Sequence, residues 1–386
     1  MYDENDPIEQ KNRAKRRKKL IRFAVIVILL LAAAVIYVTQ EVWLPKLRGI
    51  GKQYQTIVND GQLEEGNFPI ELSGGGNYQL KYSGKELVLL SDAYVNFYSE
   101  DGALIKRRQH AYTNPVMLAE NERALIFESG GDEISVEDVN EVLYTHKFDN
   151  SIIFARLSAD GYTAVVTTSK SYYCEIYVYD RTGACIYERK CVERADDISF
   201  HEGSKGCVIS YIDARGGGMV TYAQEIDFKE KTEKWTSPAI DTFGLEVYSC
   251  EGSAFILGMD SCGYAGGNGL IGSEYVYDGD IKGGASRGGK SAVIINNNDR
   301  RKYTLVLFSG VGNDPQEIEI GSPLVDITIS EGLVYVMSQE SIQAYDFSGG
   351  LRSTAQVGDS YTGFVRSSGA IYLKGHNRID KISYES

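Results

Sequence analysis

The residues of this chain that most resemble a catalytic or nucleotide-binding motif lie between Gly284 and Ser291. They match the pattern G-x-x-x-x-G-K-S, in which a strand enters a phosphate-binding loop and a helix leaves it. The residues that follow, Ala292 to Ile295, are mostly β-branched and lead into an asparagine-rich turn instead of a helix. We therefore expect the match to be accidental and predict no nucleotide ligand.

Two further pattern matches overlap the same glycine-rich stretch. Gly284 to Gly288 match G-x-S-x-G, but a nucleophilic serine in that pattern needs a strand-to-helix turn in an α/β sheet. Gly267 to Gly272 match a dinucleotide-binding pattern, yet strand-like residues 274–277 follow instead of a helix. Because residues 263–289 include ten glycines, such matches arise by chance, and we interpret this stretch as one long, mobile loop between strands.

Residues that could bind a metal or a carbohydrate are few and scattered. The run Asn296 to Asp299 offers oxygen ligands for calcium, but it lacks the alternation of a calcium loop and is better explained as a hairpin turn. Trp235 is the only tryptophan after Trp43, which is weak support for a carbohydrate platform. The histidines have no metal-ligand spacing: His110, His146, His201 and His376. We predict no catalytic residues, no metal and no cofactor.

Six cysteines lie within a short part of the sequence: Cys174, Cys185, Cys191, Cys207, Cys250 and Cys262. No pair has C-x-x-C spacing, which argues against a structural zinc site or a thioredoxin-like redox pair. Cys174 and Cys191 flank an expected hairpin, and a disulfide between them is chemically allowed outside the cytoplasm. Small buried hydrophobic residues within strands are the favoured interpretation of all six, and both interpretations stay open at this point.

Eight basic residues between Lys11 and Arg22 lead directly into sixteen uncharged, mostly apolar residues, Phe23 to Val38. Such a run is stable as a membrane helix, and Lys and Arg are retained on the cytoplasmic side. We predict a basic cytoplasmic tail over residues 1–22, a transmembrane signal anchor over 23–40 and a juxtamembrane stalk over 41–65. A cleaved signal peptide and a buried soluble helix are the alternatives; the segment stays apolar after Ala32 and Ala34, which favours the anchor.

The charge of the chain is divided unevenly between the expected tail and the rest. Of 40 basic and 53 acidic residues, eight basic and four acidic ones lie in residues 1–22, which leaves 32 basic and 49 acidic residues beyond them. A net charge of −17 disfavours phosphate backbones, so we expect no nucleic-acid partner. We predict a single-pass protein of the cell membrane, with the bilayer as one partner and a large extracytoplasmic domain.

From Asn67 onward, short runs rich in Val, Ile and Tyr alternate with Gly, Asp, Asn or Ser, which is typical of strands joined by tight turns. A unit consisting of an apolar strand end, three turn residues and Gly or Asn begins at Tyr98, Val136, Tyr179, Phe308 and Tyr345. Degenerate copies are expected near Phe228 and Tyr277. A repeat of about 40 residues with four short strands predicts an all-β fold, a β-propeller, over residues 66–386.

The blade count follows from the repeat. We predict eight blades, with seven as the alternative, because residues 260–290 are too irregular to count cleanly. The last unit, residues 364–386, holds only three strands. We therefore predict that Phe68 to Leu72 supply its fourth strand and close the ring.

The layout resembles the domain-of-unknown-function family numbered 5711, bacterial membrane-anchored propellers. The resemblance is carried by the basic run with its anchor, by Asn67-Phe68-Pro69-Ile70, and by turns such as Tyr345-Asp346-Phe347-Ser348-Gly349. It implies the topology and the fold, but it brings no activity and no catalytic residues. Similarity to quinoprotein-like and outer-membrane-assembly propellers is looser and concerns the fold only.

The sequence favours a non-catalytic scaffold on the outer side of the membrane, which binds a protein or a cell-wall-associated partner. This hypothesis depends on the anchor, the stalk, the rigid ring and the lack of a convergent acid–base set. One alternative is a ligand sensor at the cell surface, although the short charged tail makes a poor output domain. Another is an envelope enzyme that uses carboxylates in the central channel of the propeller.

Overall fold

The computed structural model describes residues 68–72, 78–250, 252–268, 271–358 and 360–383. All regular secondary structure within these ranges consists of β-strands. None of the described residues forms a helix that could span a bilayer. The chain divides into residues 1–55 and residues 56–386, and all described residues belong to the second unit. The predicted cytoplasmic tail, transmembrane helix and stalk over residues 1–65 therefore lie outside the described residues.

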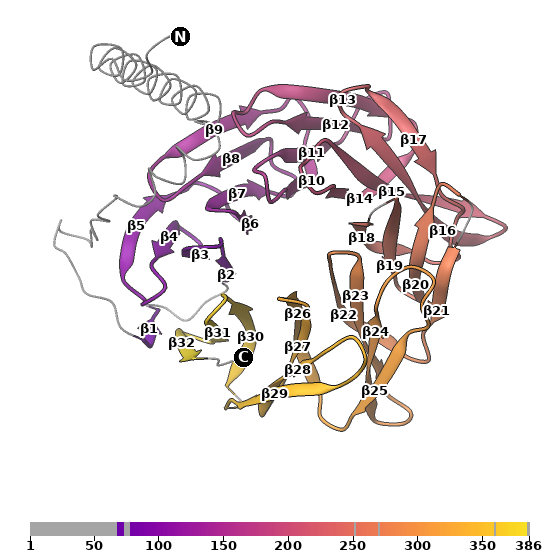
Figure 1. Cartoon of the computed structure of the whole chain (residues 1–386). Coiled ribbons are helices and arrows are strands. Elements are labelled where there is room, and N and C mark those ends of the chain that lie inside the picture. Colours follow the sequence, from indigo (N-terminus) through magenta and orange to yellow (C-terminus); the bar gives the residue numbers. More distant parts are fainter. Residues whose placement is uncertain (1–67, 73–77, 251, 269–270, 359, 384–386) are drawn as a thin grey trace, which may run out of the picture. The chain divides into compact units, whose positions relative to one another are not determined.

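The second unit is built from four-stranded antiparallel sheets, which are the blades of a propeller (Figure 1). Blade 1 contains β2 (Gln79–Tyr82), β3 (Leu87–Leu90), β4 (Tyr94–Tyr98) and β5 (Leu104–Gln109). Blade 2 contains β6 (Pro115–Glu120), β7 (Arg123–Glu128), β8 (Glu133–Glu137) and β9 (Val142–Lys147). Blade 3 contains β10 (Ile152–Leu157), β11 (Thr163–Thr167), β12 (Cys174–Tyr179) and β13 (Cys185–Cys191). Blade 4 contains β14 (Arg194–Phe200), β15 (Gly206–Arg215), β16 (Gly218–Asp227) and β17 (Thr232–Thr236).

Four more sheets complete the ring, so the prediction of eight blades is confirmed. Blade 5 contains β18 (Gly244–Cys250), β19 (Ser253–Gly258), β20 (Ser261–Gly266) and β21 (Ile271–Val276). Blade 6 contains β22 (Asp280–Arg287), β23 (Lys290–Asn297), β24 (Lys302–Phe308) and β25 (Gln316–Ile320). Blade 7 contains β26 (Leu324–Ser330), β27 (Leu333–Ser338), β28 (Ser341–Tyr345) and β29 (Leu351–Gln356). Blade 8 contains β30 (Tyr361–Arg366), β31 (Ala370–Gly375), β32 (Arg378–Ser383) and β1 (Ile70–Glu71).

Blade 8 is made from both ends of the propeller sequence. Strand β1 pairs antiparallel with β32, with Ile70 opposite Ile379 and Glu71 opposite Arg378. It is therefore the outermost strand of the last blade, the position that the sequence suggested for residues 68–72. Pairing of this kind covers the edge of β32, which would otherwise stay exposed.

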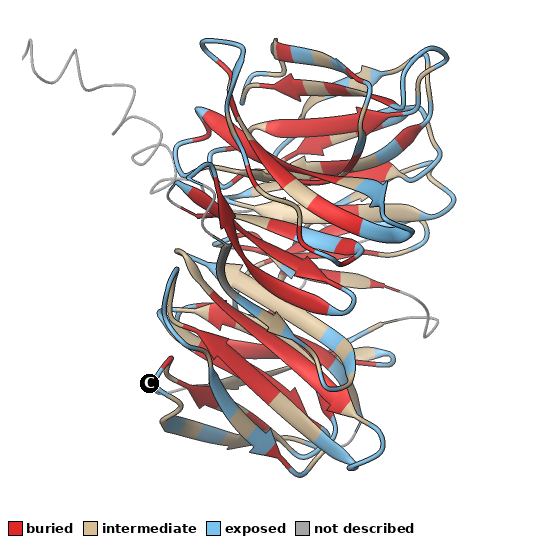
Figure 2. Cartoon of the chain, turned by 90° about the vertical axis from the view of Figure 1, so that its right-hand side faces the viewer, coloured by how far each residue is buried: buried red, intermediate tan, exposed pale blue. Residues whose placement is uncertain are grey.

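Hydrophobic clusters fill each gap between adjacent blades, including the gap between blades 8 and 1. The largest fully buried side chains are tyrosines on second or third strands, namely Tyr211, Tyr264, Tyr335 and Tyr372. The second and third strands are mostly buried, whereas the outer fourth strands, such as β17 and β29, and the turns are largely exposed (Figure 2). Most of the stability of the ring therefore comes from apolar packing between blades.

The turn between the third and fourth strands explains the sequence repeat. In blade 3 the Asp180 carboxylate accepts hydrogen bonds from two backbone N–H groups of its turn, at 2.8 and 3.0 Å. In blade 7 Asp346 does the same at 2.9 Å in both cases. The turns end at Gly183 and Gly349, with φ of 87° and 88°, a conformation that favours glycine. The aspartate and the glycine thus form one structural unit in blades 3 and 7.

The prediction of one long loop over residues 263–289 is wrong, because this stretch contributes to β20, β21 and β22. Glycine is required there by close packing and not by mobility. A Cβ atom on Gly284 would lie 2.8 Å from Cδ2 of Leu257 in the neighbouring blade. The unit expected near Tyr277 is also wrong, since Tyr277 follows β21 and joins blades 5 and 6. The unit expected near Phe228 does lie in the β16–β17 turn.

The strand directions give the ring two different faces. Each blade has four alternating strands and a short link to the next blade, so all first strands begin on the same face. We call this the connection face; it carries the links between blades and the turns between second and third strands. The other face, which we call the turn face, carries the first–second and third–fourth turns. Phe68 lies at the turn face, against Gly102 of the β4–β5 turn.

Candidate functional site

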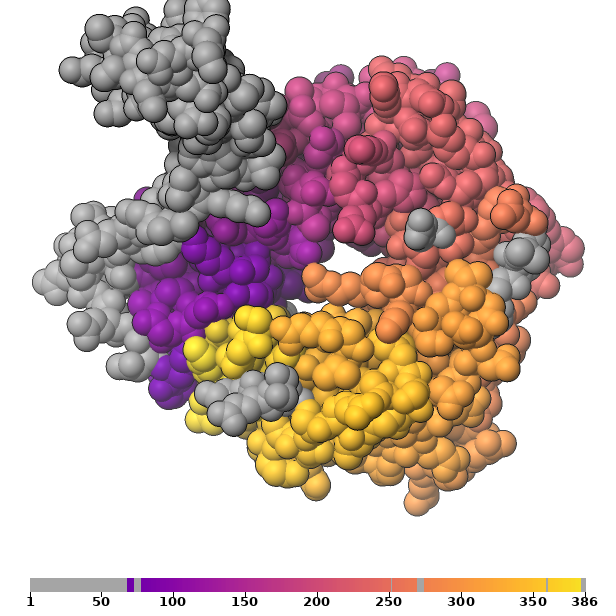
Figure 3. Space-filling model, in the orientation of Figure 1, coloured from indigo at the N-terminus to yellow at the C-terminus, as the bar shows by residue number. Residues whose placement is uncertain are grey.

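The first strand of each blade lies nearest the centre of the ring, and first strands of neighbouring blades contact one another, as β14 and β18 do. They enclose a channel whose opening is visible in the space-filling view (Figure 3). Channel walls of this kind place side chains from distant parts of the sequence in one space. Side chains of these first strands are therefore candidate functional residues.

Asp197 of β14 is buried and connects three blades. Its carboxylate accepts a hydrogen bond from Nε of Arg156 in blade 3 at 2.7 Å and from the Val247 backbone N–H in blade 5 at 2.9 Å. It also accepts one from the N–H of Ile198, at 2.7 Å. Burial raises the pKa of Asp197, and the Arg156 charge and the backbone donors oppose this rise. Both of its carboxylate oxygens are thus engaged within the fold.

Asp326 of β26 has the equivalent role at blades 7 and 8. It accepts hydrogen bonds from the N–H groups of Ile327 at 2.9 Å and Phe364 at 3.0 Å. Burial raises its pKa, and these donors counteract the rise. Two of the carboxylates that the sequence left as candidates for channel chemistry thus link neighbouring blades.

Asp196, next to Asp197, is the channel carboxylate best suited to exchange a proton. Burial, followed by the negative charge of Asp197, raises the pKa of Asp196 to about 7, although Arg156 and Ser210 lower it. Such a group can act as a general base at neutral pH. A hydrolytic site also needs an activated nucleophile. The groups around Asp196 are instead the Arg156–Asp197 ion pair, which already links two blades, and Ser210, whose hydroxyl donates to the backbone carbonyl of Asp197.

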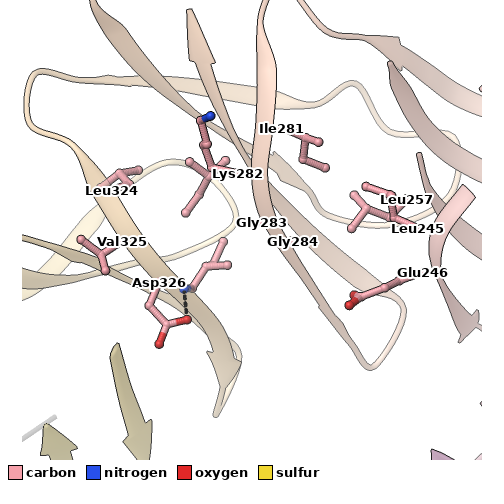
Figure 4. Close-up of a pocket in the computed structure, with 12 residues that line it drawn as sticks. Leu245, Glu246, Leu257, Ile281, Lys282, Gly283, Gly284, Leu324, Val325 and Asp326 are labelled. Carbon is pink, nitrogen blue, oxygen red and sulfur yellow. Dashed lines mark hydrogen bonds between the residues drawn. The ribbon is translucent and has the colours of Figure 1, made fainter. Parts of the chain in front are cut away.

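A pocket of about 320 Å³ opens between blades 5, 6 and 7, close to the connection face (Figure 4). We call it the apolar pocket; its apolar walls come from Leu245, Leu257, Ile281, Ile294, Leu324, Val325 and Ile327. It exists because β22 has Gly283 where β14 and β26 have Asp197 and Asp326. Glu246 supplies a carboxylate at its margin, and the Lys282 ammonium points away from that carboxylate.

A larger cavity of about 750 Å³ lies along the channel and is lined by blades 1, 2, 6, 7 and 8. We call it the basic cavity, because Lys81, Arg287 and Lys374 line it together with Glu120. Arg287 is at the tip of the β22–β23 hairpin, and its charge acts on Glu120 of β6. Val325, Asp326 and Ile327 line both the basic cavity and the apolar pocket.

The residues that matched nucleotide and nucleophile motifs form a plain hairpin. Arg287 pairs with Lys290 across a two-residue turn, Gly288 and Gly289, whose φ angles are 59° and 73°. These values are typical of a tight β-hairpin turn and not of a phosphate-binding loop before a helix. The Lys290 ammonium lies 5.0 Å from the ring centroid of Phe347. Residues 269–270 of the dinucleotide match lie outside the described residues.

The histidines lie on separate blades, namely His110 after β5, His146 on β9, His201 after β14 and His376 after β31. Among the residues that the structure describes, no group of three or more His, Cys, Asp or Glu side chains is arranged to hold a metal. The run Asn296 to Asp299 spans the end of β23 and the start of the β23–β24 turn, and Nδ2 of Asn296 donates to Oδ1 of Asn298 at 2.7 Å.

Sequence reasoning missed a Ser–His–Glu arrangement between blades 4 and 5. Nδ1 of His201 lies 2.5 Å from Oγ of Ser249, and its Nε2 lies 3.4 Å from Oε1 of Glu225. Burial lowers the pKa of His201, and Glu225 opposes this effect. A serine nucleophile needs backbone N–H donors beside it for the oxyanion. The N–H of Ser249 is instead bound to Oγ of Ser199 at 2.9 Å, so the arrangement serves as a contact between blades.

Cys174 and Cys191 face each other directly across the β12–β13 pairing, as the hairpin suggested. Both are buried free thiols. Of the other four cysteines, Cys207, Cys250 and Cys262 are also buried, and Cys185 is exposed. A hydrogen bond from Cys191 lowers the pKa of Cys174 to about 7, while the same contact raises the pKa of Cys191. The described thiols therefore pack as small side chains within strands.

Exposed large hydrophobic side chains gather on one face of the ring. Of the fourteen within the described ranges, eleven lie at strand ends, links or turns of the connection face. These are Tyr94, Ile153, Tyr172, Tyr173, Val192, Met219, Phe243, Leu245, Met259, Val276 and Val325. The turn face has the other three, Val142, Val311 and Leu351. The links between blades could be made of polar residues without loss of the fold. The fold therefore does not require the exposed apolar side chains of the connection face.

The strands and their closure define the class of this protein as an eight-bladed β-propeller. Within that class, the chain belongs to DUF5711, a family of unknown function, whose model matches residues 66–383. This is the family that the sequence resembled. A comparison with curated proteins gives no match.

Several solved structures share the fold. BamB from Moraxella catarrhalis is 12% identical, covers 84% of this chain and 99% of its own, and gives a TM-score of 0.54. The computationally designed protein Ika8 is 10% identical, covers 81% and 98%, and gives 0.62. Sqt1 from Saccharomyces cerevisiae is 7% identical, covers 82% and 98%, and gives 0.57. At these identities the similarity shows the fold alone.

Proposed function

We propose that this protein is a membrane-anchored, extracytoplasmic and non-catalytic scaffold that binds a protein partner through the connection face of its propeller. The observation that carries this proposal is the concentration of exposed apolar side chains on that face. Exposed apolar surface of this kind is typical of protein–protein contact sites. A closed ring is rigid, so it presents such a surface with little loss of conformational entropy on binding.

The chemistry of the connection face also indicates what the partner is like. Tyr173 and Val276 are 63% and 70% exposed, and Leu245 and Val325 lead into the apolar pocket. The chain beyond residue 22 has a net charge of −17, and Glu246 lies at the margin of that pocket. The matching partner surface is apolar at its centre and neutral to basic at its rim.

The position of the first propeller residues supports the same choice of face. Phe68 lies at the turn face, next to Gly102, so the stalk proposed for residues 41–65 would join the ring there. The connection face is the face of the ring opposite Phe68. The rings of Phe68 and Tyr372 lie 5.7 Å apart, although the two residues are far apart in the sequence. This contact holds Phe68 against the last blade.

The absence of catalysis is part of the proposal and is supported by the channel carboxylates. Asp197 and Asp326 are committed to backbone donors of neighbouring blades, and the Ser249 arrangement has its own N–H occupied. A scaffold needs these contacts for rigidity, whereas an enzyme would need at least one of them free for substrate. These observations favour the scaffold over the envelope enzyme.

The partner proposal is tested by paired surface substitutions in intact cells. The variant Tyr173→Ser with Val276→Ser removes apolar area from the connection face, and Leu351→Ser with Val311→Ser removes it from the turn face. After chemical crosslinking, we expect the first variant to yield several-fold less of the crosslinked adduct than the wild type, and the second variant to match the wild type. Equal yields from both variants, or a loss only in the second, would contradict the proposed face.

The membrane placement is tested by protease added to intact protoplasts. We expect digestion of the chain beyond about residue 45, while a tag before Met1 stays protected with the basic tail. Survival of the whole propeller until the membrane is opened would show that the domain is cytoplasmic and would refute the placement.

A further inference from the structure

We propose that the basic cavity is a binding site for a small polyanion, that is, a ligand with two or more phosphate or carboxylate groups. The site is formed by Lys81 of β2, Lys374 of β31 and Arg287 at the tip of the β22–β23 hairpin. The proposal does not depend on the protein partner proposed above, because the three cations are not among the exposed apolar residues of the connection face.

None of the three cations forms a salt bridge with another described residue. Among the described residues, no carboxylate lies within 4.0 Å of the Lys81 or Lys374 ammonium or of the Arg287 guanidinium. The other acidic residues of the cavity wall are engaged, because Asp326 binds backbone N–H groups and Glu331 binds Arg366 at 2.6 Å. The charges of Glu120 and Asp326 act on the cations, and burial raises the pKa of both carboxyl groups. The described lining holds Lys81, Arg287, Arg366 and Lys374 against Glu120, Asp326 and Glu331. The balance of charge in the cavity is therefore positive.

Two of the cations act against each other. Burial lowers the pKa of Lys374, and the positive charge of Lys81 lowers it further, although Asp326 opposes this. Positive charges held near each other in a partly buried space repel, and this repulsion is relieved when an anion binds between them. Lys374 also lies 5.1 Å from the ring centroid of Tyr78, a contact that fixes the direction of its long side chain.

The setting makes this arrangement unusual within the molecule. Beyond residue 22 there are 49 acidic and 32 basic residues, so clusters of unpaired basic side chains are not expected by chance. The three cations come from blades 1, 6 and 8 and converge only because the ring brings the blades together. The volume of about 750 Å³ suits a ligand of ordinary metabolite size. Narrow, low-dielectric clefts also focus the field of such charges on a ligand.

Titration calorimetry of the full chain in detergent micelles tests the proposal, with inorganic pyrophosphate and citrate as separate probes. The site variants are Lys81→Gln, Lys374→Gln and Arg287→Gln. The matched control is Lys170→Gln, an exposed lysine of the β11–β12 link outside the cavity. We expect one probe molecule per chain, an affinity about tenfold weaker in each site variant and no change in the control, since each loses one charge-assisted contact.

The two probes separate the possible sources of the anionic group. Binding of pyrophosphate alone assigns a phosphate ligand, binding of citrate alone assigns a carboxylate ligand, and binding of both assigns a general polyanion site. Arg287 is exposed at a hairpin tip, so its variant is expected to fold even if Lys374→Gln is destabilised. The proposal is overturned if neither probe binds at up to about 10 mM, or if the control weakens binding as much as the site variants do.

Discussion

The two faces of this propeller are made from the same repeated blade, yet they differ in what their residues are needed for. On the turn face, Asp180 and Asp346 bind their own turns, and Gly183 and Gly349 take conformations that favour glycine. On the connection face, exposed side chains such as Tyr173 are not required by strand pairing. Folding therefore explains the turn face, whereas the exposed apolar side chains of the connection face are not needed for the fold.

The largest expected effect concerns the chain ends that meet in blade 8. A chain that begins at Gly74 lacks β1, so the edge of β32 and the apolar surface under Phe68 and Ile70 become exposed. Burial of these two side chains contributes about 3–6 kcal/mol, which is comparable with the net stability of a domain. We expect this chain to aggregate or to melt at a clearly lower temperature than one that begins at Gly61. Equal thermal unfolding of the two would show that β1 does not close the ring.

Substitution of the two blade-linking carboxylates, Asp197 and Asp326, should lower the free energy of unfolding by different amounts. Asp197→Asn leaves the Arg156 guanidinium without its anion and is expected to lower the free energy of unfolding by about 3–5 kcal/mol. Asp326→Asn weakens bonds to two N–H groups without stranding a charge and should cost about 1–3 kcal/mol. Denaturant unfolding of both variants measures this difference. If both were neutral, the carboxylates would be free for channel chemistry, and the enzyme alternative would regain support.

Asp196 gives the ring a specific dependence on pH. Its pKa is raised from 3.8 to about 7, so the folded state keeps a proton that the unfolded chain has lost between these values. Stability from this group is therefore complete below about pH 4, falls as the pH rises to about 7, and is constant above that. We expect the melting temperature of Asp196→Asn, relative to the wild type, to rise over this range and then level off.

The control for this measurement is Asp92→Asn, which changes an exposed aspartate in the β3–β4 turn. Its melting temperature should follow that of the wild type at each pH. If the Asp196→Asn difference were independent of pH, Asp196 would be ionised in the folded state throughout, and its burial beside Asp197 would not control its protonation.

The fold was accessible from the sequence because its turn chemistry is local. An aspartate and a glycine at fixed spacing form a turn by themselves, so units at Tyr179 and Tyr345 predicted blades before any packing was known. The unit of blade 5 is not recognisable in the sequence, because β20 ends in Ala265 and Gly266 and lacks the aromatic or apolar residue that ends the third strand at Tyr179 and Tyr345. There, glycines chosen for close packing were taken as signs of a loop.

The candidate sites were not accessible in the same way, because they depend on contacts between distant residues. Lys81, Arg287 and Lys374 share a cavity only after ring closure, and no local pattern marks them. A signal did exist for the blade-linking carboxylates. Asp197 and Asp326 are each followed by Ile and a hydroxyl residue at the same position of the first strand, which an alignment of the blades within the chain would reveal.

The difference between the two faces is tested most directly by site-specific photocrosslinking in intact cells. A photoreactive residue is placed at Tyr173 or Val276 on the connection face, and at Val142 or Leu351 on the turn face, all of which are exposed. The account predicts adducts with the same protein from both connection-face positions and none with that protein from the turn-face positions. Adducts from the turn face alone, or adducts with a second copy of this chain from the connection face, would contradict it.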